Sequence, residues 1–454
     1  MDKGLIGRGV VLAMLAGGAV ALARPGPDVT LSDIGDTTNY GLVGGIRGYA
    51  IGSNTCNIGN VNLLWLSSGT PGLAMNGYRL YNGRLTQIGM SWAKTACCAA
   101  AGTGPCGTCN GAGGNVLGVG CLDVYSAGWN GGQTRLGPRY AINAYSGAFQ
   151  SFPATSGDAI YRRLQIAQAD LSTTAFEGAQ FFVEGVYVGS DDAASGNWLN
   201  NATYKRVTVN QTNFNLTVAG AAQVGIPAIR AWRDHGLGAN VPDPSVTVGQ
   251  VTVPAEGTFW FAHKAKDLGN GSWRYEYAVF NLNSDRSGGS FSVPVPAGVN
   301  VSNVGFSAPL YHSGEPYSNA PWVSSVANGA VTWQSPETFQ QNINSNALRW
   351  GTMYNFWFDA STAPTAATAT LGLFKPFTPA SVTFAIQGPT GGTCYPNCDG
   401  STIAPILNVN DFQCFINSYA AGDSYANCDG STTAPVLNVN DFVCFQQSFA
   451  TGCR

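Results

Sequence analysis

Charged residues are scarce in this sequence. Only 22 Lys and Arg and 25 Asp and Glu occur among its 454 residues, which is 10 % of the chain, whereas an average soluble domain carries about 25 %. Histidine occurs only three times, and the formal net charge is −3. Such a chain has no basic field to neutralise a phosphate backbone. The composition therefore argues against nucleic acid as a partner and against a helical cytosolic protein.

Long apolar runs are also missing, except for one near the start. This run extends from Gly9 to Ala23, follows Lys3 and Arg8, and ends in Ala-Leu-Ala. It is shorter than the about 20 apolar residues that a bilayer-spanning helix needs, and a short run with these flanks is typical of a signal peptide. We therefore expect residues 1–23 to be removed on export, leaving no transmembrane segment.

Cysteine is absent between residues 122 and 393 and concentrated on either side of that stretch. The two groups of six are Cys56, Cys97, Cys98, Cys106, Cys109 and Cys121, then Cys394, Cys398, Cys414, Cys428, Cys444 and Cys453. Even numbers of cysteines in an exported chain favour disulfides. The alternative for the first group is a zinc site around Cys106-Gly-Thr-Cys109.

Abundant turn residues and short alternating segments predict β structure. The chain contains 59 glycines, and residues 258–267 and 273–282 flank Gly269-Asn270-Gly271 in the pattern of a β-hairpin. No alternation of strands with helices is visible, which favours antiparallel sheets. The predicted fold is mainly β: an antiparallel β-sandwich or jelly-roll-like body with a disulfide-rich N-terminal region and a small helical, EF-hand-like C-terminal module.

This organisation implies four parts after the signal peptide. We expect a Gly/Cys-rich β region at 28–161, a β-sandwich domain at 162–385, a linker at 386–393 and a C-terminal module at 394–454.

The C-terminal module contains a duplication. Residues 395–415 and 425–445 are identical at 17 of 21 positions with a period of 30. Each copy places oxygen-bearing residues at calcium-loop spacing, interrupted by a five-residue insertion, and aromatic residues at helical spacing follow. The candidate calcium ligands are Asn397, Asp399, Ser401, Asn408 and Asp411 in the first copy, and Asn427, Asp429, Ser431, Asn438 and Asp441 in the second. The alternative is a pair of Asn/Asp-rich turns that cap their own backbone without a metal.

Repeat symmetry also predicts disulfides in the module. The spacing from Cys398 to Cys414 recurs from Cys428 to Cys444, which favours one bridge within each copy. Cys394 and Cys453 have no counterparts in the repeat, so we expect them to pair with each other.

From Cys394 to Cys453 the sequence resembles a dockerin, a duplicated calcium-loop-plus-helix module that docks onto a cohesin. It differs in carrying Tyr395 and Tyr425 at the first ligand position, in the insertion and in its cysteines. Most of the chain also resembles secreted proteins of planctomycete-type bacteria of an uncharacterised family, through segments such as 281–286 and 348–351. The dockerin resemblance implies calcium as the cofactor and a cohesin-like or envelope protein as the partner.

Catalytic signals are weak by comparison. No Gly-x-Ser-x-Gly motif is present. Glu184 and Glu276 each lie among aromatic residues in an expected strand and are the candidate acid/base residues of a glycoside hydrolase, although such carboxylates usually lie on a solvated strand face. Five tryptophans could stack on sugars or fill the core: Trp260, Trp273, Trp333, Trp350 and Trp357.

The leading hypothesis is an exported, non-catalytic extracellular or cell-surface protein. Its calcium-binding, dockerin-like tail would dock it to a partner, and its body would be structural or glycan-binding. The alternative is a polysaccharide-acting hydrolase that carries the same tail.

Overall fold

The computed structural model describes residues 24–66, 71–391, 395–401 and 405–452. These residues form antiparallel sheets with a small helical unit at the C-terminal end, which confirms the predicted fold class. The expected signal peptide and the Cys394–Cys453 bridge lie outside the described residues. Within them, no helix combines the length and apolar character needed to cross a bilayer.

The first part of the body is built on a nine-stranded sheet in the order β14-β13-β12-β6-β7-β11-β3-β2, with β10 paired to β7. Its strands are β2 (Thr37–Val43), β3 (Ile46–Ile51), β6 (Gly72–Tyr81), β7 (Arg84–Thr95), β10 (Leu136–Gly137), β11 (Leu164–Ala167), β12 (Gln180–Val188), β13 (Ala202–Val209) and β14 (Leu216–Gln223). Strands β11 to β14 follow residue 161 and complete the sheet that β2, β3, β6 and β7 begin. The expected division at 161/162 therefore lies inside one sheet.

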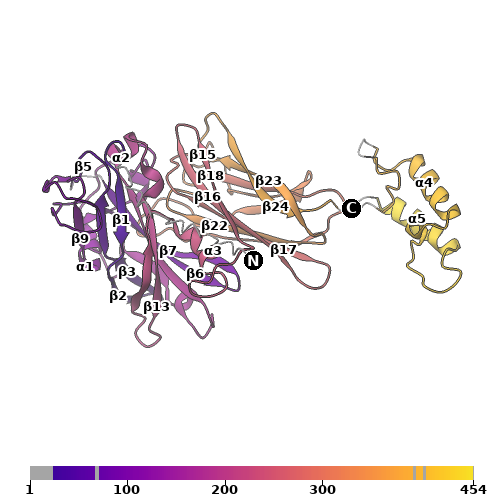
Figure 1. Ribbon diagram of the computed structural model, residues 1–454, viewed down its shortest axis with the longest axis horizontal. Helices are drawn as coiled ribbons and strands as arrows, with labels where there is room; N and C mark the ends of the chain where they lie inside the picture. Colours follow the sequence, from indigo (N-terminus) through magenta and orange to yellow (C-terminus); the bar gives the residue numbers. More distant parts are fainter. Residues whose placement is uncertain (1–23, 67–70, 392–394, 402–404, 453–454) are drawn as a thin grey trace, which may run out of the picture.

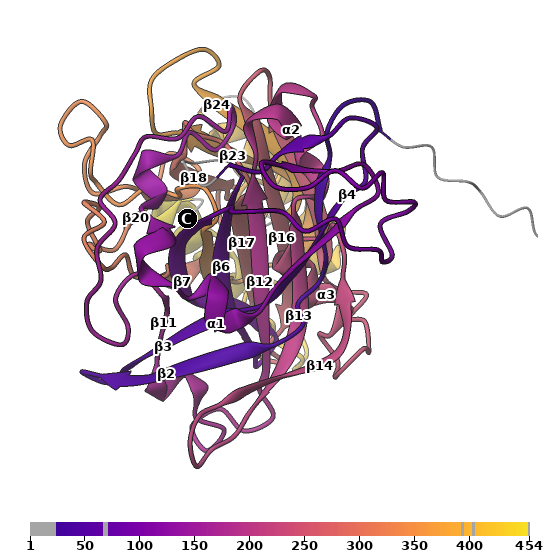
Figure 2. The same ribbon diagram turned by 90° about the vertical axis from the view of Figure 1, so that its left-hand side faces the viewer.

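Smaller elements cover this sheet (Figure 2). A three-stranded sheet contains β1 (Val29–Asp33), β4 (Ser53–Asn57) and β9 (Leu122–Tyr125), and a short pair contains β5 (Leu63–Leu64) and β8 (Val116–Leu117). The helical elements of the body are α1 (Ala127–Asn130), α2 (Ser190–Ala194), α3 (Ala231–Asp234) and the 3-10 turns η1 (Gln133–Arg135), η2 (Arg139–Ala141), η3 (Gln168–Leu171), η4 (Trp198–Asn200) and η5 (Ala228–Arg230).

The first six cysteines form three disulfides among these elements. The pairs are Cys56–Cys106, Cys97–Cys98 and Cys109–Cys121. The Cys-x-x-Cys segment therefore contributes to two disulfides, and the described structure shows no zinc site there.

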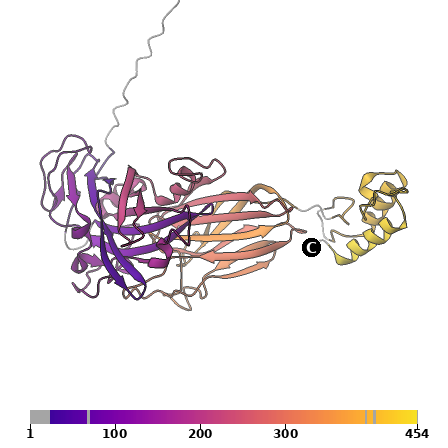
Figure 3. The ribbon, with the colours of Figure 1, turned by 90° about the horizontal axis from the view of Figure 1, so that it is seen from below.

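The second part of the body is a sandwich of two five-stranded antiparallel sheets (Figures 1 and 3). One sheet has the order β15-β16-β17-β22-β19 and the other β20-β21-β18-β23-β24. The strands are β15 (Thr247–Val253), β16 (Gly257–Asp267), β17 (Trp273–Asn281), β18 (Gly288–Pro294), β19 (Val301–Ser307), β20 (Val323–Ala327), β21 (Ala330–Gln334), β22 (Met353–Ala360), β23 (Pro364–Leu373) and β24 (Ser381–Pro389). Part of the expected linker, residues 386–389, thus belongs to a strand.

The predicted hairpin forms two neighbouring strands of the first of these sheets. Strands β16 and β17 pair from Phe259–Asn281 to Asp267–Trp273. Because side chains alternate along a strand, Tyr275 and Tyr277 enter the sandwich core. Phe280 faces the other way, into a separate cluster that joins the sandwich to the first part of the body.

That joining cluster makes the two parts of the body one packed unit. Tyr78 from β6 and Trp232 from α3 pack in the cluster that contains Phe280, and all three are fully buried. At its edge, Nε and Nη2 of Arg84 each lie 2.6 Å from a carboxylate oxygen of Glu276.

The C-terminal module consists of α4 (Val409–Ala420), α5 (Val439–Thr451) and the 3-10 turn η6 (Ser424–Ala426). Figure 1 shows it as a separate helical unit beyond the sandwich. Phe415 and Phe445 stack with ring centroids 4.1 Å apart and are fully buried. The bridges Cys398–Cys414 and Cys428–Cys444 confirm the pairing within each copy.

Candidate functional site

The first loop of the module brings its five candidate ligand residues together through a chain of hydrogen bonds. Asn397 Nδ2 donates to the carbonyl of Ser401 (2.8 Å), and the Ser401 amide donates to Asp399 Oδ1 (2.9 Å). The Asp399 amide donates to Asp411 Oδ1 (3.2 Å), and the Asn408 amide donates to Asp411 Oδ2 (2.8 Å). The loop is thus folded around the Asp411 carboxylate, which is fully buried.

The second loop repeats this arrangement. The four corresponding contacts, from Asn427 to Ser431, Ser431 to Asp429, Asp429 to Asp441 and Asn438 to Asp441, measure 2.9, 2.9, 3.2 and 2.8 Å. Two sequence copies therefore form one local structure twice.

Asp411 and Asp441 also help to cap the first turns of α4 and α5. The Asn408 side chain accepts from the Asn410 amide at 2.8 Å, and Asp411 completes a capping box at the start of α4. Asn438 and Asp441 do the same for α5. Such boxes satisfy backbone N–H groups that have no partner inside the helix, so these residues stabilise the fold whether or not a metal binds.

One oxygen in each loop is left without a partner. Asn397 Oδ1 and Asn427 Oδ1 are buried and accept no hydrogen bond from the part of the chain that the structure describes. The amide orientation is fixed, because Nδ2 of each Asn donates to a carbonyl. A buried acceptor of this kind costs about 1–3 kcal/mol unless something binds it.

Backbone hydrogen bonds favour the ionised form of Asp441. Burial opposes its ionisation, but hydrogen bonds from the Asn438, Asp429 and Cys428 amides hold its pKa below the ordinary value. Two carboxylates, an amide oxygen and a carbonyl oxygen form a donor set that fits a hard cation such as calcium. Among the described residues, however, no three His, Cys, Asp or Glu side chains gather into a metal cluster.

The tyrosines at the first ligand position have another role. Tyr395 donates its hydroxyl to the Tyr425 carbonyl at 2.8 Å, and Tyr425 donates to the Tyr395 carbonyl. Their rings stack with centroids 4.9 Å apart. This reciprocal pair ties the two loops together and supplies no carboxylate to either.

Glu184, the first candidate catalytic residue, is fully buried in the nine-stranded sheet. Its carboxylate accepts from the Ala228 amide (2.6 Å), Asn76 Nδ2 (2.8 Å) and the Tyr78 hydroxyl (2.6 Å). Burial raises its pKa, and these three donors oppose the rise. In this structure the carboxylate has no surface that a substrate could contact.

Glu276 lies in a different sheet and a different environment. It sits on β17, where its carboxylate forms the two-bonded ion pair with Arg84 and a longer one with Arg274 at 3.7 Å. Glu184 is on β12, in the other part of the body. The structure does not bring the two carboxylates into one site.

The tryptophans proposed for sugar stacking are largely enclosed. Trp333 is fully buried in the sandwich core, and Trp350 is 4 % exposed. Arg84 lies over the Trp357 ring at 3.7 Å from its centroid. Trp260, Trp273 and Trp357 are half-buried, and the first two pack against the core clusters, so none of the five rings is largely exposed.

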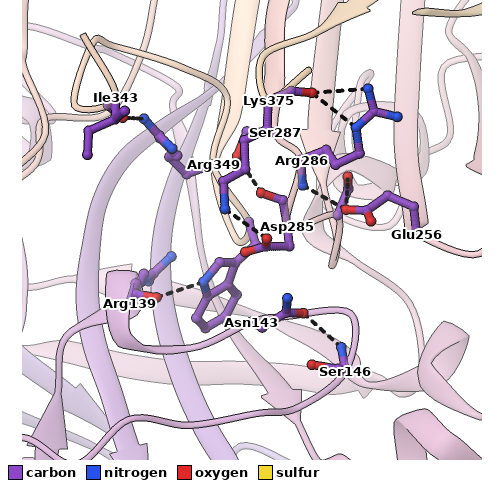
Figure 4. Close-up of polar contacts among 12 residues, drawn as sticks. Arg139, Asn143, Ser146, Glu256, Asp285, Arg286, Ser287, Ile343, Arg349 and Lys375 are labelled. Atoms are coloured by element: carbon purple, nitrogen blue, oxygen red, sulfur yellow. Dashed lines mark hydrogen bonds and ion pairs between the residues drawn. The ribbon is translucent and has the colours of Figure 1, made fainter. Parts of the chain in front are cut away.

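Segments 281–286 and 348–351 contact each other, and Figure 4 shows Asp285, Arg286 and Arg349 from them. Asn281 Nδ2 donates to the carbonyls of Ser284 and Leu348 at 2.9 and 3.0 Å. Figure 4 shows Arg286 directed toward Lys375, and its guanidinium donates to the carbonyls of Lys375, Phe377 and Pro379. The sequence drew attention to these segments but gave no sign that Arg286 fixes a distant loop, the one that connects β23 to β24.

Comparisons with known proteins are uninformative on function. No family model and no curated protein matches the chain. Weak likenesses occur to a structure of Gaeumannomyces graminis manganese lipoxygenase with part of Komagataella pastoris zonadhesin (9 % identity, 79 % of this chain, 94 % of that chain, TM-score 0.17) and to the N-terminal domain of a Streptococcus gordonii adhesin (8 %, 82 %, 99 %, 0.18). A third is Amycolatopsis orientalis exo-chitosanase (10 %, 75 %, 25 %, 0.15). Such low scores establish no shared fold or activity.

Proposed function

We propose that this chain is an extracellular protein whose dockerin-like module binds calcium and docks the body onto a cohesin-like or envelope protein. The supporting observation is the twin loop, in which a buried amide oxygen without a partner among the described residues accompanies two aspartates in each copy. The five disulfides among the described residues suit an oxidising compartment outside the cytosol.

Calcium would act on this module as a structural ion. When bound, it supplies positive charge to the paired carboxylates and a partner for the unsatisfied Asn oxygen. In the first loop the residues that would hold it are Asp399, Asp411, Asn397 and the carbonyl of Ser401. In the second loop they are Asp429, Asp441, Asn427 and the carbonyl of Ser431. The capping boxes already order the helix starts, so the ion adds stability to a loop that is largely formed.

Docking is supported by an exposed apolar residue at each helix start. Val409 and Val439 are 77 % and 72 % exposed and occupy equivalent positions in the two copies. Single exposed apolar residues are common on protein surfaces, so the support for docking lies in their recurrence at the same position of both copies. The repeat therefore presents the same contact residue twice.

Calorimetry on the full chain tests the calcium proposal. We expect two calcium ions to bind per chain, and the double change Asp399→Ala with Asp429→Ala to abolish the heat. Glu177→Ala removes an exposed carboxylate from the body and should leave binding unchanged. A wild-type chain that gives no heat with calcium at millimolar concentration would overturn the proposal.

A further inference from the structure

The body has a hollow of about 470 Å³ at one end of the sandwich. Two loops form its walls: residues 335–341, which follow β21, and residues 374–380, which connect β23 to β24. Its floor is Ser290 on β18 and Gln334 on β21, which pair across the sheet. They alternate with the buried Phe291 and Trp333, so the floor is the outer face of the sheet, opposite the sandwich core.

Aromatic rings line one wall of this hollow. Phe377 is 79 % exposed, whereas Phe374 beside it is only 6 % exposed. Phe374 is held from one side by Phe339, edge-to-face at 5.6 Å, and lies near the Arg349 guanidinium at 4.8 Å. The wall thus has a fixed buried base and one ring left open to solvent.

The loop that carries Phe377 is held in place by Arg286. This side chain is 6 % exposed and donates four hydrogen bonds of 2.8–3.1 Å to three carbonyls of the loop. The Phe374 and Lys375 amides in turn donate to the carbonyls of Ser287 and Arg286, each at 3.0 Å. The exposed ring is therefore presented by a rigid support, which lowers the entropy cost of binding.

The remaining lining is polar but nearly uncharged. Gln334 and Gln340 are exposed, and their side-chain amides make no hydrogen bond within the described residues. Arg286 is committed to backbone carbonyls, and Glu337 is the single carboxylate in the lining. The side chain of Glu337 accepts from Asn342 Nδ2 at 2.6 Å.

We infer that this hollow binds a neutral saccharide chain. A pyranose ring has C–H groups on one face, which suit an aromatic ring such as Phe377, and hydroxyl groups at its rim, which suit amides such as Gln334 and Gln340. The volume of the hollow lies in the range of about 300–1,000 Å³ that is typical of ligand sites. The inference concerns the body alone and holds whether or not the tail binds calcium.

Affinity electrophoresis of the full chain tests this site. Native gels would contain hydroxyethylcellulose, glucomannan or xylan as neutral polymers, or polygalacturonate as the charged polymer. EDTA would be present throughout to keep calcium off the C-terminal module. We expect at least one neutral polymer to retard the protein more than polygalacturonate does. Phe377→Ala should weaken that retardation about tenfold, and Gln334→Ala should weaken it less.

The matched control is Leu237→Ala, an exposed apolar residue in the loop after α3 that is 63 % exposed and should leave retardation unchanged. Because Phe377 projects into solvent, its loss should also leave the unfolding temperature unchanged. No retardation by any of the three neutral polymers overturns the inference, as does full retardation of Phe377→Ala. Binding of a proline-rich peptide in place of all three polymers would reassign the hollow to a protein partner.

Discussion

Replacing Asp441 by alanine separates the folding role of the loop carboxylate from its role toward calcium. Asp441 accepts the Asn438 amide at 2.8 Å and the Asp429 amide at 3.2 Å, and it is fully buried. Its neighbour Asp429 is exposed and accepts from the Ser431 amide at 2.9 Å in the same loop. Both carboxylates would bind the proposed calcium ion, but without the ion only Asp441 holds the loop and the start of α5 together.

The magnitudes follow from these contacts. Asp441→Ala removes two part-buried hydrogen bonds to a charged group, one from the Asn438 amide of the capping box and one from the Asp429 amide, each worth about 1–2 kcal/mol. Asp441→Ala should thus destabilise the module by about 2–4 kcal/mol in chelator. Asp429→Ala removes one exposed bond and should cost about 0.5 kcal/mol.

Hydrogen exchange of the full chain, followed by mass spectrometry, measures both effects in peptides from α5. In EDTA, Asp441→Ala should speed exchange roughly 30- to 1000-fold and Asp429→Ala about twofold. In calcium, both variants should lack the added protection of the wild type. Equal acceleration by the two variants in EDTA would refute the reasoning, because it would give the exposed carboxylate the role assigned to the buried one.

The pH dependence of α5 has a definite sign. The pKa of Asp441 is lower in the folded module than in the unfolded chain. Its contribution is therefore present above the unfolded pKa and is lost as pH falls through the folded pKa. Protection of α5 in EDTA should weaken in acid, and Asp441→Ala should remove that part of the dependence.

Three further predictions concern the body. Glu184→Ala leaves three buried donors without their acceptor and should lower the unfolding free energy by about 3–5 kcal/mol in chemical denaturation; unchanged stability would contradict the network around it. Arg84→Ala removes the ion pair with Glu276 between the two parts of the body and should cost about 1–2 kcal/mol in the same assay; a matching loss in an Arg84→Lys variant would show that the two-bonded geometry matters. Glu315 accepts a hydrogen bond from the Arg139 amide at 2.8 Å, and burial raises its pKa to about 7. Its contribution to stability is therefore full below the unfolded pKa and is lost as pH rises toward and through 7. Glu315→Gln should flatten the fall in unfolding temperature between pH 5 and pH 8, and identical profiles for the two proteins would contradict a raised pKa.

Features of the module that depend on local sequence could be predicted well. The two helices are predicted from aromatic residues at helical spacing. The bridges Cys398–Cys414 and Cys428–Cys444 are predicted from the equal spacing of the two cysteines in each copy. The candidate ligands come together because each set occupies one short stretch of its copy, 397–411 or 427–441. Calcium itself stays a prediction.

The body could be predicted only where neighbouring strands are consecutive in sequence. The hairpin of β16 and β17 was visible because its turn and both arms are contiguous, from residue 257 to residue 281. Strand β12 instead pairs with β6, and five strands and four helical elements of the chain separate the two. Alternation alone does not reveal which strands become neighbours. For the same reason the burial of Glu184 and the pairing of Glu276 with Arg84 could not be foreseen, since the partners that decide each environment lie far away in the sequence.

Strand β24 relates the two proposed binding functions in space. Ala380 lines the hollow directly before β24 begins, and the strand ends at Pro389, just before the tail. Nine strand residues at about 3.3 Å each span roughly 30 Å, so the hollow and the tail attachment lie at opposite ends of this sheet. In the proposed arrangement the sandwich therefore separates the end that would dock from the end that would bind saccharide, and the packed cluster around Phe280 joins it to the disulfide-bonded first part of the body.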